Sequence, residues 1–255
     1  MSFFKRILNL KGEAAAANEQ RQATRYAVGP DFPLKTVLNL YGRDADGKLL
    51  KSSDGTGRDW SGRMFNLSAT GASMRLPNSA FAARGEACQL KFVLGESTLV
   101  IPAYIAHFRV YSAHATCGVA LRFPDDETQA SYQQLLYPVS IGASLAQVDP
   151  KQVTQDADGF IKEEFKGENS HLVIWRAKAN LVLQGFDFRM GDYGVRWTDG
   201  LEEMDCYAVV HGTDDLLEIN EEQKVEVRWL FCLSVPNLPK GVPTDVREFL
   251  GRLVA

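Results

Sequence analysis

The chain has 255 residues, a length that favours two modest domains, although one large β domain is an alternative. Apolar residues make up 45% and charged residues 24% of the sequence, a composition typical of globular proteins that excludes disorder over most of the chain. The longest apolar run, residues 99–106, falls short of the roughly 20 residues that span a bilayer. The sequence therefore predicts no transmembrane segment.

The net charge of −4 is distributed unevenly along the chain. Residues 1–150 contain 16 Lys and Arg against 13 Asp and Glu, a balance of +3, whereas residues 151–255 contain 12 against 19, a balance of −7. A basic first half suits an anionic ligand, but this charge is far below that of a duplex nucleic-acid binder. We expect no DNA or RNA partner.

The first half predicts a small β-barrel, preceded by an amphipathic helical or flexible segment at residues 1–18. Strand patterns with apolar residues at alternate positions follow at regular spacing, in residues 34–41, 72–76, 88–94, 99–111 and 117–123. Several short strands at this spacing predict an antiparallel barrel or sandwich. A helix capped by Asp125 or Asp126 comes next, and we expect Pro138 to end or kink it.

The predicted fold class is mainly β, with two domains. Residues 19–148 are assigned to the barrel and its C-terminal helix, and residues 149–170, which are polar and poor in core-forming side chains, to a linker. Residues 171–255 predict a second β-rich (α+β) domain that ends in a helix at residues 244–254. Because this half repeats the order of strands followed by a helix, a diverged copy of the barrel is an alternative.

The sequence shows no motif of catalysis or metal binding. Its four cysteines and four histidines lack the spacing of a metal site or a disulfide scaffold, and no hydrolase elbow, P-loop or dinucleotide fingerprint occurs. We therefore expect free thiols, no metal, no cofactor, no catalytic residues and no enzymatic activity. The first ten residues lack the apolar stretch and cleavage site of a secretory signal, so we expect a cytoplasmic protein.

Two short motifs stand on either side of the first predicted strand. Arg21-Gln-Ala-Thr-Arg25 places two guanidinium groups four residues apart, and Asn66-Leu-Ser68-Ala-Thr-Gly71 lies just ahead of a strand. Each has an ordinary explanation by itself, the first as a solvated helix face and the second as a turn. The two motifs in this order, followed by the predicted strands and helix, resemble the PilZ domain, a family of cyclic di-GMP receptors. The similarity covers about residues 19–140.

The resemblance implies a role for each motif residue. Arg21 and Arg25 would bind a phosphate and a guanine edge of cyclic di-GMP, because a guanidinium fork matches both groups. The Asn66 carbonyl would accept from a guanine N–H, and the Ser68 hydroxyl would bond a phosphate or a base. Gly71 would permit a close backbone approach or a positive φ.

One departure of the sequence from the family pattern lies just before the arginine pair. Members usually carry a further basic residue just before the arginine pair, where this chain has Gln20. The departure leaves open whether the ligand binds as one molecule or as an intercalated pair. Gln20, Arg63 and Arg75 are accessory candidates for the site.

The sequence thus predicts a cyclic di-GMP-binding signalling protein. The ligand would order the Arg-x-x-x-Arg segment and change contacts with the second domain or with a protein partner that the sequence does not identify. The resemblance implies a bacterial protein that regulates motility, exopolysaccharide synthesis or biofilm formation. The first alternative is a ligand-free adaptor that uses the same barrel for protein–protein interaction, and a weaker one is an enzyme in residues 171–255.

Overall fold

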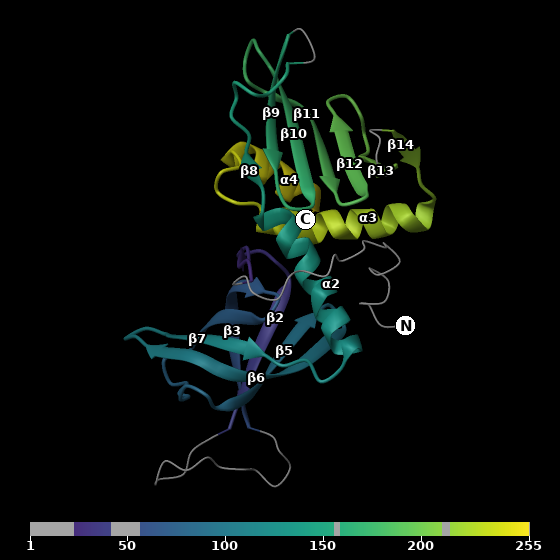
Figure 1. Cartoon of the computed structure of the whole chain (residues 1–255). Helices are drawn as coiled ribbons and strands as arrows, with labels where there is room; N and C mark the ends of the chain where they lie inside the picture. Colours follow the sequence, from purple (N-terminus) through teal and green to yellow (C-terminus); the bar gives the residue numbers. More distant parts are fainter. Residues whose placement is uncertain (1–22, 42–56, 156–158, 211–214, 255) are drawn as a thin grey trace. The chain divides into compact units, whose positions relative to one another are not determined.

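The computed structural model describes residues 23–41, 57–155, 159–210 and 215–254 (Figure 1). The helical or flexible segment predicted for residues 1–18 lies outside these ranges. Within the described residues the chain divides into two compact units between Leu136 and Tyr137. Each unit has its own sheet, and the two are described separately below.

The first unit is built from seven antiparallel strands, six of which close into a barrel. The strands are β1 (Tyr26–Ala27), β2 (Leu34–Leu40), β3 (Arg58–Ser68), β4 (Gly71–Leu76), β5 (Ala87–Leu94), β6 (Ser97–Val110) and β7 (Ala115–Leu121). Their order is β1-β3-β2-β5-β6-β7-β4, and a further pairing of β4 with β3 closes the ring. This closure gives each of the six barrel strands two neighbours, and it confirms the barrel predicted from the strand pattern.

Alternating side chains fill the barrel. In β5 and in residues 99–105 of β6 every second residue is buried, and Leu90, Phe92 and Ile101 are fully enclosed. Two cysteines, Cys88 and Cys117, belong to this core, and all four cysteines of the chain are thiols, as predicted. The residues between the buried ones point outward, with polar side chains such as Gln89 and Lys91 on β5 and exposed apolar ones such as Val100 on β6.

The helix α2 (Asp126–Ala143) covers one end of the barrel (Figure 1). The carboxylate of Asp125 caps it by accepting a hydrogen bond of 2.7 Å from the backbone N–H of Thr128. Tyr132 is fully buried, and the centroid of its ring lies 5.7 Å from that of Phe92 and 5.5 Å from that of Phe123. The first half of the helix is therefore part of the barrel core.

Pro138 lies inside α2, so it does not end the helix, which is one of the two outcomes that the sequence predicts for it. Proline removes one backbone donor from a helix, which usually breaks it. Here Leu135 is buried in the first unit, and Ile141 is buried in the core of the second. Burial of side chains on both sides of the proline outweighs the lost hydrogen bond, so the helix continues to Ala143.

The second unit is a seven-stranded antiparallel sheet. Its strands are β8 (Ala146–Gln147), β9 (Phe160–Lys166), β10 (Ser170–Ala177), β11 (Leu183–Met190), β12 (Tyr193–Thr198), β13 (Asp205–Val209) and β14 (Leu216–Glu218). Each strand pairs with the next along the chain, and within the described ranges no pairing joins β8 to β14. This open meander differs in connectivity from the barrel, so the second unit is not a diverged copy of the first.

One strand of this sheet, β9, falls in residues 149–170, which the sequence analysis assigns to a linker. The segment reads as polar because Phe165 is its only fully buried strand residue, while the other side chains of β9 are partly exposed. A strand with a single core residue has too weak a hydrophobic pattern to be recognised from sequence.

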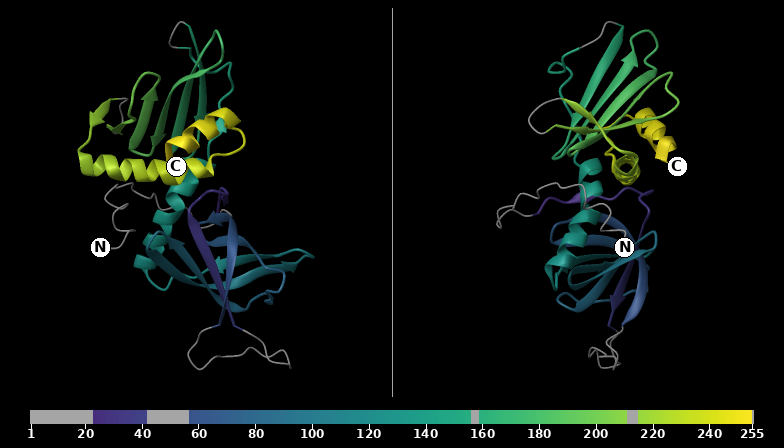
Figure 2. Two further views of the ribbon diagram at one scale, coloured as in Figure 1. Left: turned by 180° about the vertical axis from the view of Figure 1, so that it is seen from behind. Right: turned by 90° about the vertical axis from the view of Figure 1, so that its right-hand side faces the viewer.

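Helices α3 (Glu221–Ser234) and α4 (Thr244–Val254), joined through the 3₁₀ helix η1 (Val235–Asn237), pack on one face of this sheet (Figure 2). Phe231 of α3 is fully buried, with its ring stacked on Phe186 at 5.9 Å and edge-on to Phe188 at 6.2 Å. No helix in the described parts of the chain has the length and hydropathy needed to cross a bilayer. Among the residues that the structure describes, no helix packs on the opposite face of the sheet.

Candidate functional site

The Asn-x-Ser-x-x-Gly motif forms the hairpin between β3 and β4. Asn66 and Ser68 lie in β3, and Gly71 is the first residue of β4. Ser68 pairs with Gly71, so that only residues 69 and 70 form the turn. The motif is therefore a hairpin that holds Asn66 and Ser68 in fixed register.

A β-bulge in β3 decides which way the motif residues point. The register shifts between Met64 and Asn66, where Phe65 is the additional residue. On either side of the bulge, Met64 and Leu67 are buried in the barrel core. Because successive strand residues alternate between faces, Asn66 and Ser68 lie on the outer face of the barrel.

The short strand β1 brings Arg25 to this hairpin. Tyr26 pairs with Leu67 and Ala27 pairs with Asn66. Arg25 immediately precedes β1, and continuing the antiparallel register by one residue places it level with Ser68. Arg25 is exposed. The two motifs, 40 residues apart in sequence, are thus neighbours in the fold, whereas Arg21 and Gln20 lie outside the described residues.

Ser68 is largely buried, with 6% of its surface exposed. Its hydroxyl donates to the backbone carbonyl of Gly71 at 3.2 Å, and its own carbonyl accepts from the Tyr132 hydroxyl at 2.8 Å. Burial raises the pKa of Tyr132, which keeps this phenol protonated as a donor. Because the single hydroxyl proton of Ser68 is engaged, its free lone pair suits a guanine N–H better than a phosphate oxygen.

Gly71 is required by a close approach of two strands. A β-carbon at this position would lie 2.8 Å from the backbone carbonyl oxygen of Val119 in β7. The φ angle of Gly71 is not positive, so the left-handed conformation considered from the sequence does not occur. This glycine serves the barrel closure between β4 and β7.

Replacing Gly71 with valine is expected to destabilise the protein by about 1–3 kcal/mol, because the new side chain must displace the β7 backbone. The matched change Ala69→Val adds bulk at the exposed turn beside it and should cost less than about 0.5 kcal/mol. Urea unfolding of both variants measures the difference. Equal stability of the two variants would show that the β4–β7 approach does not constrain residue 71.

Four ladder partners on the outer face form a row across β3, β4, β7 and β6, which we call the motif row. It consists of Asn66, Ser73, Gly118 and His107. The ring of His107 occupies the space where a side chain of residue 118 would lie, so glycine at this position is what allows the imidazole to lie over the sheet. No other described residue bonds the side-chain amide of Asn66. The motif row thus presents an amide, a hydroxyl and an imidazole along one line.

A second row, two residues from the motif row along β4, β6 and β7, is rich in arginine. It consists of Arg63, Arg75, Thr116 and Arg109. The Arg75 guanidinium donates to His114 Nδ1 at 3.2 Å, and within the described part of the chain neither Arg63 nor Arg109 pairs with a carboxylate. Two strand residues span about 7 Å, so these cations border the motif row. The outer face at the hairpin is therefore suited to an anion that also offers hydrogen-bond donors and flat rings.

Comparison with known protein families identifies the domain that contains the two motifs. The sequence model of the PilZ domain family matches residues 19–137, the segment that contains both motifs, the barrel and the first half of α2. Residues 19–137 form a PilZ domain. The family resemblance noted from the two motifs is confirmed.

Solved structures similar to the chain include other PilZ proteins. The PilZ domain of CeSA from a cellulose-synthesizing bacterium is 16% identical, with 45% of this chain and 96% of that chain covered and a TM-score of 0.31. MrkH of K. pneumonia in complex with c-di-GMP is 12% identical, with 47% and 51% covered and a TM-score of 0.34. PlzA of Borreliella burgdorferi in complex with c-di-GMP is 8% identical, with 82% and 94% covered and a TM-score of 0.31. A comparison with curated protein sequences finds no match.

Sequence reasoning does not identify His107 and Arg109 as neighbours of the motifs. They lie about 40 residues beyond Asn66, and β6 contains a bulge between Ile105 and His107 that changes which residues face outward. The period-2 pattern of residues 99–111 would place side chains correctly only up to that bulge. The closure of the PilZ barrel by the β3–β4 and β4–β7 pairings is what brings β6 residues into the rows.

Proposed function

We propose that the outer face of the PilZ barrel binds cyclic di-GMP at the β3–β4 hairpin and that the protein acts as a receptor. The observation that carries the proposal is the register of β1 on β3, which sets Arg25 level with Ser68 in the hairpin that also holds the outward-facing Asn66. Cyclic di-GMP has two phosphates and two guanines, so it requires cations and hydrogen-bonding groups on one surface. Solved PilZ proteins similar to this chain include two with c-di-GMP in the complex.

We assign the roles of the motif residues as follows. Arg25, and with it Arg21, bonds a phosphate or the O6/N7 edge of a guanine. The amide of Asn66, which no other described residue bonds, offers its oxygen to guanine N–H groups. The Ser68 oxygen accepts a hydrogen bond from the ligand through its remaining lone pair, because its hydroxyl hydrogen is donated to the backbone carbonyl of Gly71. Gly71 supports the barrel and leaves the ligand face open.

The rows extend this site beyond the motifs. The exposed His107 ring offers a flat surface for a guanine, and Arg63 and Arg75 supply positive charge for the phosphates. Gln20 is an accessory candidate on the N-terminal side. If His107 stacks on a base, His107→Ala should weaken binding by about fivefold, whereas His107→Phe should retain most of the affinity.

We further propose that the ligand orders the segment with Arg21 and Arg25 and thereby changes contacts with the second unit or with a protein partner. The proposal rests on the placement of these cations at the start of the domain, before β1. Hydrogen exchange over residues 19–25 tests it, because ligand-dependent protection is expected there. Unchanged exchange at ligand saturation would contradict the switch while leaving binding intact.

The alternative function is a ligand-free adaptor that uses the barrel for protein–protein interaction. Such a barrel would have its motif face blocked by side chains, whereas Asn66 is half-exposed and has no partner in the described part of the chain. For the whole chain we propose a receptor without catalytic activity. We place it in the bacterial cytoplasm, where it would regulate motility or biofilm formation.

Isothermal titration of the full chain with cyclic di-GMP tests the proposed function. We expect saturable binding at micromolar or lower concentration, and the stoichiometry distinguishes a single ligand from an intercalated pair. Asn66→Ala should weaken binding by about tenfold through loss of hydrogen bonds to guanine. The absence of both heat and thermal stabilisation would favour the adaptor.

A further inference from the structure

A third row of outward-facing residues lies between the motif row and the turn of the β3–β4 hairpin. We call it the hairpin row. Its members are ladder partners across β3, β4, β7 and β6, namely Ser68, Gly71, Ala120 and Tyr104. Arg25 stands level with Ser68 at one end of this row, and Tyr104 stands at the other. The hairpin row therefore runs through the proposed ligand site from one side to the other.

The middle of the hairpin row is made of small residues. Gly71 has no side chain, and the exposed Ala120 beside it has only a methyl group. Adjacent strands lie about 4.8 Å apart, so about 14 Å of sheet separates Ser68 from Tyr104. Because little rises above the sheet over this distance, flat rings can lie on the outer face between the two ends of the row.

Tyr104 and Arg122 form a pair on the β6 side of the hairpin row. The central carbon of the Arg122 guanidinium lies 5.5 Å from the centroid of the Tyr104 ring. The backbone N–H of Arg122 donates to the carbonyl of Pro102 at 2.8 Å. The preceding N–H, of Leu121, donates to the carbonyl of Thr70 in the hairpin turn at 2.9 Å. These two bonds hold Arg122 beside the turn.

Both side chains of the pair are open to solvent. Tyr104 is 43% exposed. Arg122 is exposed as well, and it lies two residues beyond Ala120, on the same outer face. His107 follows Tyr104 on β6, across the bulge, and is also exposed. The β6 side of the site therefore presents a phenol ring and a guanidinium next to the imidazole of the motif row.

The positive charge of Arg122 is not neutralised within the described part of the chain. Its guanidinium lies over the Tyr104 ring and forms no ion pair with a described carboxylate. Glu86, in the loop before β5, is only 7% exposed. The acidic residues that follow Arg122 in the sequence lie at the N-terminus of α2, which stabilises their negative charge; they are Asp125, Asp126 and Glu127.

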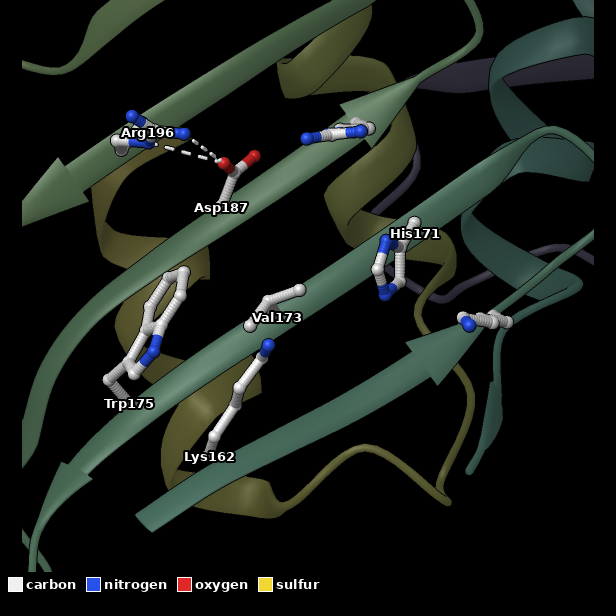
Figure 3. Close-up of a pocket in the computed structure, with 8 residues that line it drawn as sticks. Lys162, His171, Val173, Trp175, Asp187 and Arg196 are labelled. Carbon is white, nitrogen blue, oxygen red and sulfur yellow. Dashed lines mark hydrogen bonds and ion pairs between the residues drawn. The ribbon is translucent and has the colours of Figure 1, made fainter. Parts of the chain in front are cut away.

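The basic side chains of the second unit differ from Arg122 in this respect. Four of them line a pocket of about 530 Å³ over β9, β10, β11 and β12 (Figure 3). Arg196 bonds the carboxylate of Asp187 at 2.7 Å. Lys162 and Lys166 lie 3.2 Å and 3.7 Å from carboxylate oxygens of Glu164. Most of the positive charge in that pocket is therefore balanced inside the protein.

We propose that Tyr104 and Arg122 are a second contact position of the cyclic di-GMP site. The Tyr104 ring stacks on one guanine, and the Arg122 guanidinium bonds the neighbouring phosphate. This inference rests on the proposed function, because it extends the same site. Cyclic di-GMP has two guanines, and the motif row, through Asn66 and His107, provides for one of them. The pair on the β6 side provides for the other.

Isothermal titration of the full chain with cyclic di-GMP tests the tyrosine. Tyr104→Ala should weaken binding by about tenfold, whereas Tyr104→Phe should stay within about twofold of the parent, because stacking requires the ring and not the hydroxyl. Val100→Ala is the matched control. Val100 is 40% exposed on the outer face of the same strand, about 13 Å from Tyr104 on the side away from the motif row, and its replacement should leave binding unchanged.

The same titration tests the arginine. Arg122→Gln should weaken binding by about tenfold, and Arg122→Lys should recover only part of the loss, because lysine retains the charge without the planar fork. Arg58→Gln is the matched control. Arg58 is an exposed arginine that also lies over an aromatic ring, 4.2 Å from the centroid of Trp60, but at the opposite end of β3. Its replacement should leave the affinity unchanged.

Two measurements separate a lost ligand contact from a structural effect. The Nε–H resonance of Arg122, assigned with Arg122→Gln, should shift when cyclic di-GMP is added, and that of Arg58 should not. The urea midpoints of Tyr104→Ala and Arg122→Gln without ligand should equal that of the parent. Weaker binding with a lowered urea midpoint and an unshifted Arg122 resonance would overturn the proposed contacts.

Failure of this inference can be distinguished from failure of the proposed function. Parental affinity in both Tyr104→Ala and Arg122→Gln, together with weakened binding in Arg25→Ala, would overturn the second contact position and leave the receptor proposal intact. If the parent chain does not bind cyclic di-GMP, the receptor proposal and this inference are both overturned.

Discussion

Replacing Arg25 with alanine is expected to weaken cyclic di-GMP binding about 100-fold, equivalent to about 3 kcal/mol. Arg25 stands next to the β3–β4 hairpin through the pairing of β1 with β3, and no acidic residue of the described chain engages it. The substitution should therefore remove ligand contacts without breaking an internal ion pair. Isothermal titration measures the affinity, and urea unfolding without ligand should give parental stability.

Two further variants test whether the shape and the position of the Arg25 guanidinium matter for binding. Arg25→Lys retains the charge but not the planar fork, so it should recover only part of the affinity. Arg58→Ala removes an exposed arginine from the opposite end of β3, where the guanidinium lies 4.2 Å from the centroid of the Trp60 ring. It is eight residues, about 26 Å, from Asn66 and should leave binding unchanged. Parental affinity in Arg25→Ala would contradict the proposed role of this arginine.

Replacing Phe231 with alanine is expected to lower the free energy of unfolding of the second unit by about 3–5 kcal/mol. The side chain is fully buried between the sheet and α3, with aromatic contacts to Phe186 and Phe188. The substitution removes these contacts and leaves a cavity that the surrounding rings fill only in part. Urea unfolding followed by near-ultraviolet circular dichroism measures the effect.

Trp229 provides the control for Phe231 on the same helix. Its side chain is 50% exposed, so Trp229→Ala should cost less than about 1 kcal/mol. A loss below about 1 kcal/mol in Phe231→Ala would show that α3 does not hold the sheet through this aromatic cluster. Cyclic di-GMP titration of both variants should match the parent, because neither residue belongs to the barrel unit.

Much of the barrel was predictable because its strands show plain alternation. The buried positions of β5 and most of β6 follow the period-2 pattern, and the sequence analysis places strands there. Strand β9 escapes prediction because Phe165 is its only fully buried residue. Pro138 does not end α2, because side chains on both sides of it are buried and tertiary packing overrides the local propensity.

The candidate site could be recognised only in part. Spacing alone singles out Arg25, Asn66 and Ser68, because each motif is contiguous in sequence. The sequence could not show why residue 71 must be glycine, because the Val119 carbonyl that excludes a side chain there belongs to a strand about 50 residues away. His107 could not be found at all, because the bulge in β6 resets the outward direction of its side chain.

By itself, the sequence determined the PilZ family, the mainly β class and the two motifs of the proposed ligand site, since these depend on local patterns. The tertiary structure alone decided which distant residues share the motif row, that the second sheet is an open meander, and that four basic residues line one pocket over it. The physical reason is that strand register and bulges set which side chains meet. Both depend on non-local pairing, and shifting a strand by one residue turns its side chains to the opposite face.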